Sequence, residues 1–191
     1  MPGLVLGFHG CDRSHGEAVL SSGKHLRTSS NSHDWLGEGI YFWENDPWRA
    51  HDWAWEAKLK PAQVAGSIDE PFVVGAIIDL GHCCNLLDLE RSEELERAFN
   101  FISQIYAAAG RPMPENDLGP DRVRRYRDRI VVKAMHDLRR EEGLTPFQSV
   151  RAAFFEGPEL YENAGFRKKN HIQIAVCDPN CIKGYFRLPG L

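Results

Sequence analysis

The sequence has no apolar run that approaches the roughly 20 residues needed to cross a bilayer. Its first ten residues, MPGLVLGFHG, are too short and too uncharged to read as a secretory signal. It also has no evident internal repeat or low-complexity tract. These absences argue against a membrane protein and a repeat array. We therefore expect a cytoplasmic protein without a membrane partner.

An excess of basic residues is also missing. The chain has 23 Lys and Arg against 27 Asp and Glu, a formal net charge of −4, which disfavours a protein that holds long nucleic acid mainly by neutralising phosphates. Its five cysteines are odd in number, and the adjacent Cys83 and Cys84 cannot easily form a relaxed disulfide. Cys177 and Cys181 lack the usual Cys-x2-Cys spacing of zinc sites. We expect reduced thiols and no metal.

What is present is an ordinary globular composition, with 42% hydrophobic and 26% charged residues over 191 positions. That length suits one compact domain over residues 1–191. Short apolar or β-branched runs predict strands, and periods of three and four predict helices. The predicted strands are 4–9, 39–43, 72–80, 150–155, 171–176 and 182–188, and the predicted helices are 15–23, one from Pro47, 90–109 and 121–142. This pattern predicts an α+β fold with a mixed sheet of about six strands and a helical insertion at about 90–145.

Three polar or aromatic positions stand near the ends of these predicted strands: His9, Tyr41 and Gln173. Each is weak evidence by itself, because a single His or Tyr beside an apolar run is more often a satisfied core residue. Their neighbours are more informative. His9-Gly10 follows the first strand, and Gly37-Glu38-Gly39-Ile40-Tyr41-Phe42 enters the second.

These motifs closely resemble the ADP-ribosyltransferases of the diphtheria-toxin and poly(ADP-ribose) polymerase branch, in which His-Gly is followed by Gly-Lys-Gly-Ile-Tyr-Phe. The segment 170–178, NHIQIAVCD, resembles the last site strand of that family, where a Glu precedes an Asp by five positions, and Gln173 stands at the position of that Glu. The resemblance covers about 50 residues at the start and 20 near the end. It extends to small bacterial relatives with an Asp-Trp-Leu-Gly phrase and implies a split mixed sheet of the ADP-ribosyltransferase kind.

By this resemblance NAD⁺ is the substrate, and its nicotinamide leaves through a transition state with oxocarbenium character. His9 would hydrogen-bond ribose or adenosine hydroxyls, and the Gly10 backbone would meet the nicotinamide carboxamide. Tyr41 would stack on the nicotinamide ring, because an aromatic face suits a cationic pyridinium. Trp53 is the candidate for a second stacking face, with Trp48 as its competitor.

Gln173 departs from the His-Tyr-Glu pattern of the family, because an amide hydrogen-bonds but is no base. Either the acceptor brings its own nucleophile and single ADP-ribose units are transferred, or Glu156 replaces the missing carboxylate from the end of the strand 150–155. Arg151 on that strand is a candidate for contacting the pyrophosphate. The alternative for Glu156 is an ordinary strand-end carboxylate, and for Arg151 a surface charge.

The resemblance thus implies a mono-ADP-ribosyltransferase with a protein or nucleic-acid acceptor. By analogy with bacterial toxins and effectors, a cognate antitoxin or immunity protein is a possible partner. Two alternatives stay open: an NAD⁺ glycohydrolase, and a catalytically weak module that binds NAD⁺ or ADP-ribose. Arg167, Lys168 and Lys169 before the last site strand point to an anionic acceptor. A run of basic residues between 122 and 140 is either a solvated helix face or a docking surface.

Overall fold

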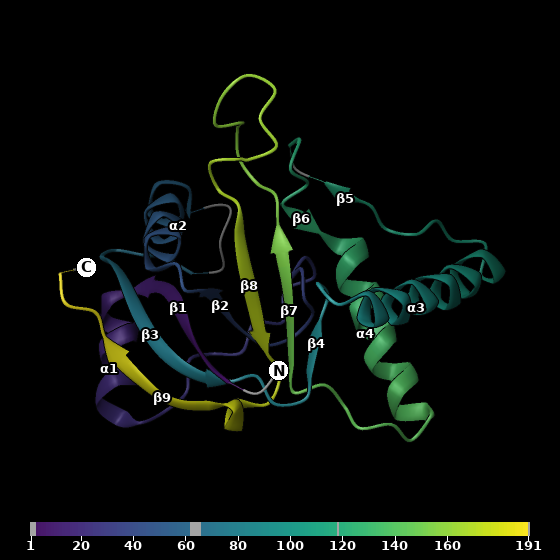
Figure 1. Cartoon of the computed structure of the whole chain (residues 1–191), viewed down its shortest axis with the longest axis horizontal. Coiled ribbons are helices and arrows are strands. Elements are labelled where there is room, and N and C mark those ends of the chain that lie inside the picture. Colours follow the sequence, from purple (N-terminus) through teal and green to yellow (C-terminus); the bar gives the residue numbers. More distant parts are fainter. Residues whose placement is uncertain (1–2, 62–65, 118, 191) are drawn as a thin grey trace.

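The computed structural model describes residues 3–61, 66–117 and 119–190. Within this part the main feature is a seven-stranded mixed sheet in the order β4-β7-β8-β2-β1-β3-β9 (Figure 1). Its strands are β1 (Leu4–Asp12), β2 (Ile40–Glu44), β3 (Pro71–Asp79), β4 (Cys83–Asn85), β7 (Ser149–Phe154), β8 (His171–Val176) and β9 (Ile182–Arg187). Neighbours pair antiparallel except β4 and β7, which are parallel. The predicted α+β class with a mixed sheet is confirmed.

Four α-helices are found in the described residues: α1 (Arg13–Ser22), α2 (Pro47–Leu59), α3 (Leu89–Ala108) and α4 (Tyr126–Glu141). The helical insertion expected at about 90–145 corresponds to α3 and α4. None of the described helices combines the length and the apolar character that a bilayer span requires. α1 ends where predicted, because Gly23 adopts a left-handed φ of 67° that closes the helix.

The ladder of paired residues between β1 and β2 is short. Only two residue pairs join these strands, Gly7 with Glu44 and Phe8 with Trp43, whereas β1 pairs with β3 along its whole length from Leu4 to Asp12. The sheet therefore consists of two halves, β4-β7-β8-β2 and β1-β3-β9, which meet at one short ladder.

Helices cover both faces of this sheet. Side chains alternate along a strand, so Tyr41 and Trp43 of β2 point to one face and Phe42 points to the other. Trp43 packs in a cluster with Ala50 of α2, and Tyr41 packs against a cluster that contains Val132 of α4. Hence α2 and α4 lie on the face of Tyr41. α1 lies on the opposite face, in the Phe42 cluster.

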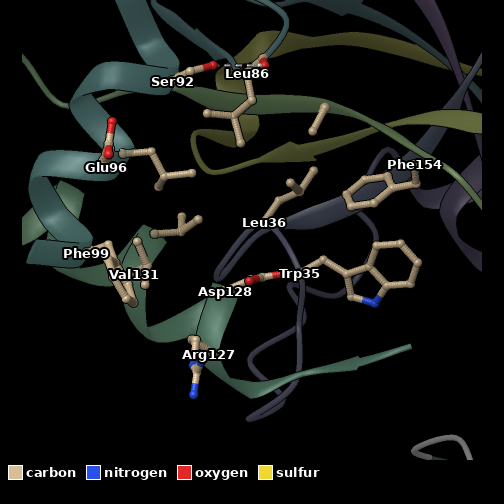
Figure 2. Close-up of a pocket in the computed structure, with 13 residues that line it drawn as sticks. Trp35, Leu36, Leu86, Ser92, Glu96, Phe99, Arg127, Asp128, Val131 and Phe154 are labelled. Atoms are coloured by element: carbon tan, nitrogen blue, oxygen red, sulfur yellow. Dashed lines mark hydrogen bonds between the residues drawn. The ribbon is translucent and has the colours of Figure 1, made fainter. Parts of the chain in front are cut away.

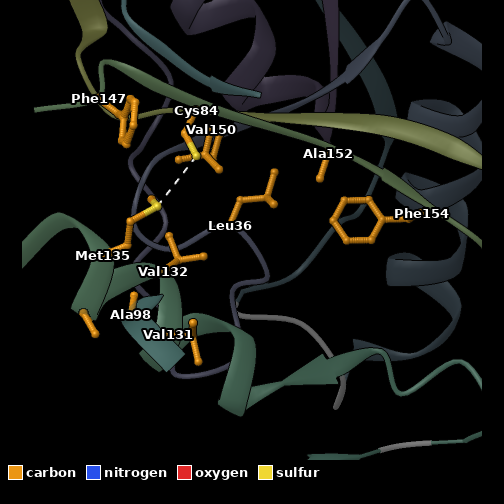
Figure 3. Packing of buried hydrophobic residues seen from close by; sticks show 12 residues of the cluster. Leu36, Cys84, Ala98, Val131, Val132, Met135, Phe147, Val150, Ala152 and Phe154 are labelled. Atoms are coloured by element: carbon orange, nitrogen blue, oxygen red, sulfur yellow. Dashed lines mark hydrogen bonds between the residues drawn. The ribbon is translucent and has the colours of Figure 1, made fainter. Parts of the chain in front are cut away.

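The largest core cluster fills the space between α4, the segment before β2, and β7 (Figure 3). Val132 and Met135 of α4 meet Leu36 and Val150 there. Cys84 contributes to this cluster, while its neighbour Cys83 packs on the opposite side, as expected for adjacent strand residues. All five cysteines are free thiols, as predicted.

Several elements differ from the prediction. β1 continues to Asp12 because β3 pairs with it that far, so His9 and Gly10 lie inside the strand and not at its end. β4 was not predicted, since three residues carry too little pattern. α4 starts at Tyr126 and not at 121, because residues 124–125 form β6, which pairs with β5 (Asn116–Asp117).

Gly10 is required where α2 crosses β1. A Cβ atom at this position would lie 2.3 Å from the Ala50 carbonyl oxygen and 3.2 Å from the Trp53 ring. We expect Gly10→Ala to lower the free energy of unfolding by about 1–3 kcal/mol, the usual cost of overpacking, in urea denaturation. Gly184→Ala on the edge strand β9 is the matched control, because its Cβ meets no atom within 4 Å. Equal stability of the two variants would contradict this close contact.

Candidate functional site

His9 bridges the two halves of the sheet just beyond their short ladder. Its Nδ1 donates a hydrogen bond of 2.8 Å to the carbonyl oxygen of Tyr41, and its ring lies 6.0 Å from that of Phe42. Burial lowers the pKa of His9 below its ordinary value, which favours the neutral ring. In that state Nδ1 carries the hydrogen, and Nε2 is left as an acceptor. The imidazole therefore fixes the backbone of β2 at Tyr41.

The hydroxyl of Tyr41 is fully engaged by the segment before β2. It donates to the Gly37 carbonyl at 2.7 Å and accepts from the Leu36 N–H at 2.9 Å. Burial raises the pKa of Tyr41 well above its usual value, so the hydroxyl stays neutral. What Tyr41 can offer a ligand is its ring.

Gln173 lies directly opposite Trp43 in the β2–β8 ladder and shares its face of the sheet. Both side chains are buried. Because residues two apart on a strand share a face, Tyr41 and His171 lie on this face too. The structure thus places Tyr41 and Gln173 on one face of adjacent strands. His9, on the neighbouring strand β1, points to the opposite face, where its ring lies beside Phe42, so the structure does not bring its side chain together with those of Tyr41 and Gln173.

A row of aromatic rings, here called the aromatic row, crosses this face from Trp53 of α2 to Trp35 in the segment before β2. The Trp43 ring lies 5.7 Å from Trp53 and 6.3 Å from His171. The His171 ring lies 5.5 Å from Phe154, which in turn contacts Trp35 at 4.2 Å. Trp53 is thus part of the aromatic row. Its competitor Trp48 is exposed on the outer side of α2, where it meets His51.

Four buried polar atoms in this region have no hydrogen-bond partner within the described part of the chain: Trp43 Nε1, Arg49 Nε, Arg125 Nε and His171 Nε2. His171 Nδ1 donates to the Lys169 carbonyl at 2.7 Å, which leaves Nε2 as an acceptor. Buried polar groups in native proteins almost always find a partner. A donor on Trp43 and an acceptor on His171 beside Gln173 therefore mark a place where the polar atoms of a ligand would be satisfied.

Glu156 faces α2 from the end of β7. The Nη2 of Arg49 donates to both carboxylate oxygens, at 3.1 and 3.3 Å, and the side chains of Arg49 and Glu156 are 8% and 13% exposed. Glu156 also lies 3.7 Å from His171 Nδ1. An ion pair thus holds Glu156 between α2 and β8, which is compatible with an ordinary structural carboxylate, and its role as a replacement base stays a prediction.

Arg151 lies on the opposite face of the sheet from Gln173. It pairs in register with Ile174, and its guanidinium donates to Glu44 at 2.5 and 2.8 Å and to Asn85 at 3.0 Å. The hydrogen bond to Glu44 raises the pKa of Arg151. Since Arg151 is buried, its interpretation as a surface charge is wrong. The structure does not bring it together with Tyr41 and Gln173, whose side chains lie on the other face.

Sequence reasoning missed Trp43, Arg49 and His171. A usable signal was present for two of them, because Trp43 and His171 stand two positions from Tyr41 and Gln173 and so share their face. Arg49 had no such signal, since its partner Glu156 is 107 positions away.

Comparison with known proteins names no activity. No family model and no solved structure matches the chain. A stretch of 48 residues is 40% identical to an uncharacterized protein of Methanocaldococcus jannaschii, covering 25% of this chain and 22% of that protein. The chain thus spans about a fifth of the length of the curated relative that it matches.

The Arg151–Glu44 pair should be structural. We expect Arg151→Met to lower the free energy of unfolding by about 3–5 kcal/mol, because it leaves the buried Glu44 carboxylate unpaired. Adding Glu44→Leu should recover part of this loss, measured by urea denaturation of both variants. A stable Arg151→Met protein with weakened NAD⁺ binding would instead favour contact with the pyrophosphate.

Proposed function

We propose that the chain is a mono-ADP-ribosyltransferase that cleaves NAD⁺, releases nicotinamide and transfers ADP-ribose to a macromolecule. The observation that carries the proposal is the adjacency of β1, β2 and β8, which bear His9, Tyr41 and Gln173. These positions are far apart in the sequence, yet their strands lie side by side, with β2 between β1 and β8, next to the short β1–β2 ladder. The proposed fold is accordingly the split sheet of the ADP-ribosyltransferases.

The site's chemistry suits a cationic ring that leaves from a sugar. The aromatic faces of Tyr41 and Trp43 are suited to a pyridinium ring, whose positive charge they attract. The amide of Gln173 can hydrogen-bond a ribose hydroxyl. Breaking the glycosidic bond of NAD⁺ releases neutral nicotinamide and leaves positive charge on the ribose, which a nucleophile of the acceptor then attacks, with loss of its proton. In this proposal the protein acts mainly by positioning.

The missing carboxylate at position 173 restricts the reaction. Gln173 cannot take a proton from the acceptor, so the acceptor must be a good nucleophile or Glu156 must receive the proton. Arg49 already donates to both carboxylate oxygens of Glu156, so this contact would have to yield before Glu156 received a proton. The two alternatives differ at this step. A glycohydrolase transfers ADP-ribose to water, and a binding module releases no nicotinamide.

An acceptor surface is proposed on the loop between β7 and β8, which projects beyond the end of the sheet (Figure 1). It exposes large apolar side chains and cations. The exposed apolar residues are Phe155, Leu160, Tyr161 and Phe166. Lys169 is less available than the sequence suggested, because its ammonium pairs with Glu56 and Asp52 of α2. Lys168 is exposed. A cognate antitoxin or immunity protein that covers this loop remains a proposal by analogy.

The proposal is tested with NAD⁺ labelled in its ADP-ribose part, incubated with the protein and a cell extract. We expect nicotinamide release and label in a macromolecular fraction. His9→Ala and Tyr41→Ala should each remove most of the turnover. Free labelled ADP-ribose alone would favour the glycohydrolase, and absence of any release would favour the binding module.

Restoring the carboxylate gives a sharper result. We expect Gln173→Glu to raise nicotinamide release at least about tenfold, within the 10²–10⁴ that a placed acid or base contributes. Gln104→Glu on α3, at an exposed position, is the matched control and should change nothing. If Gln173→Glu folds, binds NAD⁺ and releases no more nicotinamide than the wild type, position 173 is not the position of the missing base.

The acceptor loop predicts a separation of two activities. Phe166→Ser and Lys168→Ala should reduce label transfer to the acceptor severalfold while leaving NAD⁺ hydrolysis unchanged, because neither side chain belongs to the aromatic row. Phe101→Ser on α3 and Lys24→Ala are controls at other exposed positions. Equal losses of transfer and hydrolysis would show that the loop supports the site and does not select the acceptor.

A further inference from the structure

An apolar cavity of about 420 Å³ lies between α3, α4, β7 and the segment before β2, next to Trp35 and Phe154 at one end of the aromatic row (Figure 2). Its size falls within the roughly 300–1,000 Å³ of small-molecule sites. Its wall is mainly hydrocarbon, from Leu36, Leu86, Leu95, Phe99, Val131, Val132, Ala152 and Phe154. In Figure 2 the Trp35 and Phe154 rings stand on one side of the space and Phe99 and Val131 on the other. Such a wall favours an apolar ligand.

A stripe of residues on one side of α3 lines the cavity. Ser92, Leu95, Glu96 and Phe99 line the cavity and are spaced three, four and seven positions from the first, which places them on one side of the helix. The apolar members of this stripe are only partly covered by protein. Phe99 is 38% exposed. The helix thus holds apolar surface at the cavity that a ligand would bury.

Polar side chains are confined to the rim, and most are already engaged. The Asp128 carboxylate accepts from Asn116 at 2.8 Å and from Arg125 at 3.3 Å. The Arg127 guanidinium donates to the Pro114 carbonyl at 2.7 Å. For Glu96, the described part of the chain supplies no hydrogen bond or ion pair. Glu96 is therefore the rim charge that remains available.

We propose that this cavity binds a small cationic amphiphile, with its apolar part among Leu95, Phe99 and Val131 and its amino group at Glu96. The apolar wall favours a ligand with an apolar part, and the available carboxylate of Glu96 favours a ligand with a cationic group. The argument for this ligand does not rest on the transferase proposal, because Leu95, Phe99 and Glu96 lie on α3, outside the aromatic row.

The cavity shares part of its wall with the candidate site. Trp35 and Leu36 line it, and the Leu36 N–H donates to the Tyr41 hydroxyl at 2.9 Å. The Trp35 indole also lies 6.0 Å from the His171 ring. A ligand in the cavity therefore changes the surroundings of Trp35, which gives a fluorescence signal for binding.

The test is a titration of the whole protein with n-decylamine, n-decanol and decanoate below their micelle-forming concentrations, followed by tryptophan fluorescence and calorimetry. We expect one saturable site that prefers the amine, then the alcohol, then the carboxylate. Glu96→Gln should weaken amine binding up to about fivefold, to the level of the alcohol, as for a partly exposed ion pair. Trp35→Phe should remove most of the fluorescence change.

Phe99→Ala and Phe101→Ala form the deciding pair, because the two rings are 38% and 39% exposed on the same helix and only Phe99 lines the cavity. We expect Phe99→Ala to weaken amine binding about tenfold and Phe101→Ala to leave it unchanged. Leu95→Trp should fill the cavity and abolish binding, with folding checked by circular dichroism. Absence of saturable binding, equal effects of the two phenylalanine variants, or equal affinity for decanoate would overturn the proposal.

Discussion

The hydrogen bond from His9 to the Tyr41 carbonyl holds the candidate site together. The backbone ladder between β1 and β2 ends after two residue pairs, and the His9 side chain continues the connection at 2.8 Å. Burial keeps the imidazole in its neutral form by lowering its pKa. Beyond the ladder, the position of β2 relative to β1 is therefore held by this side chain. The placement of Tyr41, Trp43 and, through β8, Gln173 follows from it.

Because side chains alternate between the two faces of a strand, the polar residues of β7 and β8 lie in different surroundings. Gln173 and His171 point to the face between α2 and α4, where aromatic rings and unpaired polar atoms gather. Arg151 points to the opposite face and is bound by Glu44 and Asn85. A shift of β7 by one residue against β8 would exchange these faces, so the register of this ladder decides which charges are structural and which are available to a ligand.

Much of the fold was predictable from local pattern. The strand 171–176 and the end of α1 at Gly23 agree with the structure, because an apolar run and a terminal glycine act locally. The start of α4 was not predictable, because Asn116 from outside the helix accepts hydrogen bonds from the N–H groups of Arg127 and Asp128. Asn116 lies next to these N–H groups because β5 pairs with β6 directly before the helix.

The candidate site was only partly predictable for a similar reason. Motif resemblance identified His9, Tyr41 and Gln173, whose strands are adjacent. It also proposed that the Gly10 backbone meets the ligand, which stays a prediction; the structure shows in addition that the Ala50 carbonyl of α2 approaches this residue closely. It proposed Glu156 as a replacement base but did not indicate that Arg49 would pair with it. Pairings across 107 residues, such as Arg49 with Glu156 and Glu44 with Arg151, depend on the sheet order, which no local pattern contains.

The central claim is that NAD⁺ binds where β1, β2 and β8 meet. Hydrogen–deuterium exchange with and without a non-hydrolysable NAD⁺ analogue tests it most directly, because it reports on each segment without requiring turnover. The account predicts slower exchange in residues 8–11, 40–44 and 171–174. Unchanged exchange in these segments, or protection confined to α3 and α4, would contradict it.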